Sequence, residues 1–169
     1  MSLDPWSYAK ASEHSQQTAL FMWANMACRF GLEAAEDKLS YSIAGHAQAY
    51  LQPAEGHKPI PRLKWLHAIH NQGHGDAIRG AKARAEGVKP GVFDLFLPVP
   101  VWQPGAHNLA HTGKMICGLY LELKVGKNSM SPIQAEFAAD MTRAGYACQV
   151  AYGWLEAREK ILAYLQINA

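Results

Sequence analysis

The chain contains few cysteines and no long apolar run. Its three cysteines, Cys28, Cys117 and Cys148, lie far apart among 169 residues. An odd, scattered set does not make a disulfide framework or a zinc site, so we expect reduced thiols in a cytoplasmic protein. No apolar run approaches the roughly 20 residues of a membrane span. The first residues lack the basic start and apolar block of a secretory signal. We therefore expect neither membrane insertion nor secretion.

Common cofactor and nucleophile motifs are also missing. The sequence has no G-x-S-x-G, no Walker glycine loop and no G-x-G-x-x-G. It therefore indicates neither a serine hydrolase nor a nucleotide-binding fold, and we expect no organic cofactor. Histidines recur three or four residues apart between His67 and His74, but the intervening sequence does not favour a helix and no H-E-x-x-H is present. A zinc site is not favoured.

What is present is typical of one globular domain spanning residues 1–169. Hydrophobic residues make up 49% and charged residues 18% of the chain, a balance that supports a real core. The net charge is only +2, but residues 58–90 carry seven basic and two acidic side chains. Such a segment attracts a polyanion. It is equally compatible with a solvated basic loop.

The periodicity and turn residues predict an α/β fold with a mixed central sheet flanked by helices. We expect helices over about 12–30, 33–51, 77–87, 131–145 and 154–167, and strands over about 62–69, 91–100, 115–125 and 146–152. The helix over 131–145 has the clearest start, because Ser131, Pro132 and Gln134 form an S-x-x-Q capping box. Its buried stripe should comprise Ile133, Phe137, Met141 and Ala144.

One carboxylate stands where an apolar strand is expected. Asp94 interrupts "GVFDLFLPVP", and an uncompensated charge there costs several kcal/mol. Glu122 and Lys124 lie two apart in "LYLELKV", so both side chains leave one face of a strand. If the two strands pair, the carboxylates meet about 4–6 Å apart and need a cation between them. A hard ion such as Mg²⁺ suits these oxygens, and the ammonium could orient water or meet phosphate charge. The pattern suits phosphodiester hydrolysis, although E-x-K alone is common on exposed strands.

Two longer segments resemble a known family. "AEGVKPGVFDLFLP" and "GLYLELKVGKNSMSPIQAEFAADMTRAGYACQVAYG" are similar to the VRR-NUC nucleases of the PD-(D/E)XK superfamily. "IPRLKWLHAIHNQGHGD" resembles the corresponding stretch of short phage members. The resemblance covers residues 62–165 and reaches the first helix, but leaves 32–57 as a possible insertion. Phe93 departs from it, because the family usually has proline before the aspartate.

The resemblance implies a restriction-endonuclease-like core and assigns site roles. Asp94 and Glu122 would bind Mg²⁺ or Mn²⁺ with the backbone carbonyl of Leu123, and Lys124 would be the catalytic lysine. Gln134 matches a glutamine near the site, but the capping box is a competing reading, and one side chain can hardly serve both roles. Glu13 could be a further acidic ligand, or could simply favour the helix dipole.

Basic and polar residues around this constellation are candidate DNA contacts. Backbone contacts tolerate loose positioning, and the candidates are Arg79, Lys82, Arg84 and Lys89 before the Asp94 strand, Lys127 and Asn128 after the E-x-K strand, and Asn71 at the mouth of the site. For Asn128, turn geometry is the alternative reading, and for Asn71 it is the ordinary polarity of a loop.

The resulting hypothesis is a Mg²⁺- or Mn²⁺-dependent endodeoxyribonuclease. We expect selectivity for branched or four-way DNA and a homodimer, because a symmetric pair of sites suits a junction. Two alternatives remain open: a non-catalytic nucleic-acid-binding module that keeps the nuclease fold, and a metal-dependent hydrolase of small phosphorylated molecules.

Overall fold

A computed structural model describes residues 4–38, 40–41, 58–69, 77–105 and 113–167, without the side chains of 77–80. The chain forms two compact units. The first comprises Met1–Leu66, Leu123–Lys127 and Val150–Ala169, and the second comprises His67–Glu122 and Asn128–Gln149. That a single domain spans 1–169 stays a prediction. Much of the possible insertion over 32–57 lies outside the described residues. No helix within the described ranges is both long and apolar enough to cross a membrane.

Helices dominate the first unit. It contains α1 (Pro5–Tyr8), α2 (Glu13–Phe30), α3 (Leu32–Glu36), the 3-10 helix η1 (Pro61–Trp65) and α7 (Trp154–Tyr164). The two long helices match their predictions, and α2 packs against the other four elements. In α2, the Ser12 hydroxyl accepts the Ser15 N–H, and Gly31 with φ +92° ends the helix. Leu20 and Trp23 form its fully buried face.

The strand predicted over 62–69 is mostly wrong. Residues Pro61–Trp65 form η1, and only His67–Ala68 (β1) is extended. Pro61 supplies the φ value of a first helical turn. Leu63 and Leu66, three residues apart, are both buried, which is the period of a 3-10 helix and not that of a strand.

The main sheet is mixed, as predicted. Its order is β1-β2-β5-β6, where β2 is Leu95–Leu97, β5 is Leu119–Lys124 and β6 is Ala147–Tyr152. Strand β2 is antiparallel to both of its neighbours. The Ala147 N–H donates to the Gly118 carbonyl and the Gly153 N–H to that of Lys124. Both bonds join residues separated by the same number of positions, so β6 runs parallel to β5.

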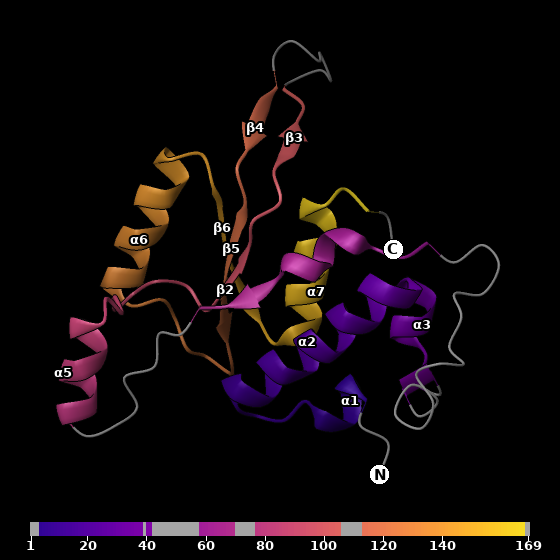
Figure 1. The fold of residues 1–169 in the computed structure, drawn as a ribbon, viewed down its shortest axis with the longest axis horizontal. Helices are drawn as coiled ribbons and strands as arrows, with labels where there is room; N and C mark the ends of the chain where they lie inside the picture. Colours follow the sequence, from indigo (N-terminus) through magenta and orange to yellow (C-terminus); the bar gives the residue numbers. More distant parts are fainter. Residues whose placement is uncertain (1–3, 39, 42–57, 70–76, 106–112, 168–169) are drawn as a thin grey trace. The chain divides into compact units, whose positions relative to one another are not determined.

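A second, two-stranded sheet was not predicted. Val101–Gln103 (β3) and Lys114–Ile116 (β4) form an antiparallel hairpin that extends beyond the main sheet in Figure 1. The strand expected over 91–100 is thus reduced to β2, because Pro98 and Pro100 cannot donate to a ladder. The strand expected over 115–125 is divided at Cys117 and Gly118.

Two helices complete the second unit, α5 (Ala77–Ala85) and α6 (Pro132–Arg143). Helix α6 starts at Ser131 with the predicted capping box. Phe137 contacts the Tyr120 ring of β5 at 5.1 Å between centroids, so α6 covers that face of the sheet. The predicted buried stripe is wrong: Ile133 and Ala144 are exposed, Phe137 and Met141 are only half-buried, and no residue of α6 is buried.

Candidate functional site

The strand register brings Asp94 opposite Glu122. Leu95 pairs with Leu121 and Phe96 with Tyr120, and continuing this register by one position aligns Asp94 with Glu122. Asp94 precedes the first residue of β2, yet its carbonyl accepts the Ile69 N–H at 2.7 Å. This bond extends the β1–β2 register by one residue. The backbone of Asp94 is therefore still part of the sheet.

Alignment of these residues has a chemical consequence. Opposed residues of an antiparallel pair leave the same face, with Cβ atoms about 4.5–5.5 Å apart. Glu122 is only 2% exposed and Asp94 is half-buried. Two ionised carboxylates at this separation, one of them buried, repel each other unless a proton or a positive charge compensates them. The conditional prediction that the Asp94 strand pairs with the E-x-K strand is confirmed.

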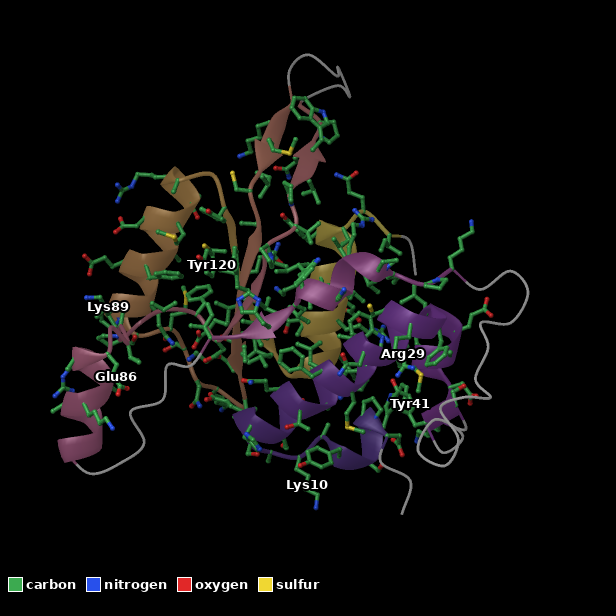
Figure 2. All side chains as sticks on the ribbon, viewed as in Figure 1. Lys10, Arg29, Tyr41, Glu86, Lys89 and Tyr120 are labelled. Carbon is green, nitrogen blue, oxygen red and sulfur yellow. The ribbon has the colours of Figure 1, made fainter. Side chains whose placement is uncertain are left out.

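The same face of the sheet is lined with aromatic rings. Phe96 stacks on Tyr120 at 4.3 Å, and Tyr146 lies against both. Figure 2 shows Tyr120 on the side that α6 covers. Burial, with smaller contributions from Tyr146 and Cys148, raises the pKa of the Tyr120 phenol. The opposite face carries fully buried leucines: Leu95, Leu97, Leu119, Leu121 and Leu123. Strict alternation thus separates the carboxylates from the apolar core.

Gln134 makes hydrogen bonds that fit both of the roles that the sequence placed in competition. The side-chain Oε1 of Gln134 accepts a hydrogen bond from the Ser131 backbone N–H at 2.9 Å. The backbone N–H of Gln134 donates to the Ser131 hydroxyl at 3.3 Å. Its Nε2 donates a short hydrogen bond to Oε1 of Glu122. The two ends of the amide are thus divided between helix cap and carboxylate. One side chain thus makes both sets of contacts, and the role of Gln134 at a functional site stays a prediction.

Three of the predicted catalytic and metal-binding residues belong to the first unit. Lys124 ends β5, two positions after Glu122, and is 8% exposed. Its carbonyl accepts the Gly153 N–H at 3.0 Å. Leu123, which lies between Glu122 and Lys124 in the strand, is buried. Glu13 is exposed in the first turn of α2. Its role as a metal ligand stays a prediction.

The donor set limits what kind of ion could bind. Among the residues that the structure describes, no group of three or more His, Cys, Asp or Glu side chains is placed to hold a metal. A site built on Asp94 and Glu122 would therefore use two carboxylates, backbone carbonyl oxygen and water. That is the manner in which proteins bind Mg²⁺, which retains several waters.

The candidate DNA contacts are mostly exposed. Lys82 lies 3.9 Å from Glu86, and Arg84 and Lys89 follow it. Figure 2 labels Glu86 and Lys89 just after α5. Lys127 and Asn128 are exposed after β5. Asn71 and the side chain of Arg79 lie outside the described part. All remain predicted contacts.

Two features were missed or unexplained by sequence reasoning. Phe93 is buried, and its ring centroid lies 5.5 Å from that of Phe137, so it is a core residue. Trp102 and Met115 are exposed, opposite one another on the hairpin. The signal was present in short alternating segments on either side of the Pro/Gly-rich connection, but three-residue strands are too short to stand out.

Comparison with known proteins gives distant likenesses among solved structures. Neither known protein families nor curated proteins yield a match. A solved structure described as "VRR_NUC domain protein" is 22% identical, with 79% of this chain and 89% of that chain covered and a TM-score of 0.47. Values this low carry no argument about activity, which must come from the residues themselves.

Proposed function

We propose that this protein is a nuclease that hydrolyses DNA phosphodiester bonds with Mg²⁺ or Mn²⁺. The observation that carries the proposal is the register that aligns Asp94 with Glu122. A buried carboxylate beside a second one is costly, and a divalent cation is the compensation that also has a use in phosphate chemistry. The resemblance of residues 85–98 and 118–153 to VRR-NUC nucleases supports the same reading.

The residues suit a hard cation. Asp94 and Glu122 would supply carboxylate oxygens, and the Leu123 carbonyl would be a third protein ligand. When bound, the ion lowers the pKa of a coordinated water and offsets charge on the phosphate. Glu13 would be a fourth ligand, or would serve only the dipole of α2.

The remaining side chains would position and stabilise. Gln134 donates a hydrogen bond to one oxygen of Glu122, which would orient the carboxylate toward the metal ion. Lys124 leaves the same face as Glu122 by strand alternation. Its ammonium would stabilise charge that develops on the phosphate or orient the attacking water. Lys82, Arg84 and Lys89, exposed before the Asp94 strand, would contact the DNA backbone.

One gel tests the proposal. Labelled linear, nicked, flap and four-way DNAs are incubated with Mg²⁺, with Mn²⁺ and with a chelator. We expect metal-dependent cleavage, strongest on branched substrates. Asp94→Asn, Glu122→Gln and Lys124→Ala should each reduce the rate by about 10²–10³-fold or more, the scale of losing a charge-stabilising group. Unchanged far-UV circular dichroism would show that the fold is kept.

The outcomes separate the three hypotheses. If purified Lys124→Ala cuts DNA as fast as wild type, the site assignment is wrong. DNA binding without cleavage in any metal would indicate a binding module. Release of phosphate from nucleotides, with DNA left intact, would instead indicate a hydrolase of small phosphorylated molecules.

A further inference from the structure

The β3–β4 hairpin is a direct extension of the strands that carry the two carboxylates. Strand β2 leads into β3 through Pro98–Pro100, and β4 leads into β5 through Cys117–Gly118. Asp94 precedes β2 and Glu122 lies in the last half of β5, whereas the hairpin follows the other end of these two paired strands. Figure 1 shows β3 and β4 beyond β2 and β5.

The hairpin has one buried and one exposed pair of apolar side chains. Val101 and Ile116 pair and are 9% and 8% exposed, whereas Trp102 and Met115 pair and are 43% and 52% exposed. Exposed tryptophan and methionine, directly opposed on a strand pair, are the side chains typical of contact surfaces.

The indole of Trp102 packs closely against Gly113. A Cβ at Gly113 would lie 2.6 Å from Cε2 and Cζ2 of Trp102 and 2.6 Å from the Gln103 carbonyl oxygen. Only glycine therefore lets the indole lie this close to the backbone of the facing segment. The ring is held on one side while much of its surface stays open to solvent, so little side-chain freedom is lost when it contacts a partner.

The charge of residues 95–121 indicates what kind of partner the Trp102–Met115 pair would contact. The whole stretch from 95 to 121 contains no aspartate or glutamate, although it lies between the two carboxylates of the candidate site. Lys114 is exposed on β4 and pairs with Gln103, so alternation directs its side chain to the other face of the hairpin from Trp102 and Met115. An exposed aromatic in a segment whose sequence carries basic but no acidic side chains suits a polyanion that has stackable rings.

We propose that the Trp102–Met115 pair stacks on an unstacked base of single-stranded or branched DNA. The inference rests on the proposed function and names the substrate feature that it recognises. Trp102 follows Asp94 by eight residues, which span at most about 26 Å of extended chain. With a rise of about 3.4 Å per nucleotide, cleavage should fall within about eight nucleotides of the stacked base.

Binding without cleavage tests this contact. Fluorescence anisotropy with labelled single-stranded, flap and linear duplex DNA is measured in chelator for wild type and Trp102→Ala. We expect affinity for single-stranded and flap DNA to fall about 5- to 100-fold, the range for one lost base–aromatic stack. Trp102→Phe should restore part of it. The salt dependence of binding should not change, because no phosphate contact is removed.

Two further variants keep the result interpretable. Tyr152→Ala removes an aromatic ring of β6 that is 50% exposed and should leave the affinity unchanged. If Trp102→Ala does not fold, Gly113→Ala, which displaces the indole, replaces it. Affinity equal to wild type in folded Trp102→Ala overturns the inference. So does a change in sedimentation, which would make the pair a contact between copies of the chain.

Failure of the inference is distinguishable from failure of the proposed function. Cleavage that is present while Trp102→Ala binds normally defeats the inference alone. Trp102-dependent binding without any cleavage defeats the nuclease and supports the inference. Absence of binding to every DNA tested defeats both.

Discussion

The side chain of Gln134 links the start of a helix to the candidate site. Its Oε1 completes the cap on Ser131 and its Nε2 holds Glu122. A partner that orients a metal ligand typically contributes about 10- to 100-fold to metal affinity or activity. The cap contributes about 1 kcal/mol to stability. The two contributions can be separated, because Ser131 takes part only in the cap.

Gln134→Ala should lose both contributions. We expect the free energy of unfolding to fall by about 1 kcal/mol and cleavage to fall by about 10- to 100-fold. Ser131→Ala, the matched control, should lose similar stability and keep its cleavage rate. Equal losses of activity in the two variants would show that Gln134 acts only through the cap. Urea titration and cleavage of a flap substrate provide the readouts.

A second residue connects pH to stability. The hydrogen bond from Lys160 (2.9 Å), followed by the Tyr152 N–H (2.8 Å), lowers the pKa of Glu156. Because the folded-state pKa is depressed, the stabilisation is complete above the unfolded value of 4.5. It is lost as the pH falls through the folded-state pKa.

Glu156→Gln should therefore destabilise the protein at pH 7 but not at pH 2. The side chain is 37% exposed, so solvent screening keeps the difference below about 1 kcal/mol at pH 7. Denaturation at both pH values measures it, with the more exposed Glu159→Gln as control. If Glu156→Gln differed from wild type by the same amount at both pH values, the ionised carboxylate would not be the source of the stabilisation.

At the scale of elements, the turn before β2 sets where Asp94 enters the sheet. Gly91 has φ +83°, and a Cβ there would lie 2.8 Å from Cγ1 and 2.9 Å from Cγ2 of Ile133, at the start of α6. Gly87 has φ +96°, and a Cβ added there would have nothing within 4 Å. Both glycines thus adopt a φ that would strain any other residue, and only at Gly91 would an added Cβ meet a close neighbour.

Gly91→Ala should cost more stability than Gly87→Ala. Both alanines are strained by about 1–2 kcal/mol, and overpacking against Ile133 adds about 1–3 kcal/mol at position 91. Adding Ile133→Ala to Gly91→Ala should recover part of the loss. Thermal unfolding of the four proteins tests this, and equal destabilisation by both glycine replacements would refute the contact.

Local signals allowed α2, α6 and α7 to be predicted from the sequence, because caps, glycine stops and apolar stripes act within a few residues. They did not reveal η1, where a proline-initiated turn overrides the alternation, or the hairpin, whose strands are very short. The alignment of Asp94 with Glu122 could only be stated as a condition. It depends on pairing between segments distant in sequence, which no local pattern determines.

At the scale of the whole molecule, a dimer stays a prediction. A four-way junction presents two equivalent strands to cut, and a symmetric pair of chains would supply two equivalent sites. We expect sedimentation velocity to give twice the 18.6 kDa of one chain at micromolar concentration, with or without metal. A single-chain mass at the highest attainable concentration would exclude the dimer and leave nicking by one site.

Metal uptake concerns the whole molecule, because an ion that binds only the folded chain stabilises all of it. At a hundred times the dissociation constant, the gain is about 2.7 kcal/mol. If Asp94 and Glu122 share the ion, both carboxylates must contribute to this gain.

Calorimetric titration with Mn²⁺ tests the shared ion most directly. Wild type should bind one ion per chain, and both Asp94→Asn and Glu122→Gln should abolish that binding while circular dichroism stays unchanged. Binding that survives in either folded variant would contradict the claim that these two carboxylates, aligned across β2 and β5, hold one cation together.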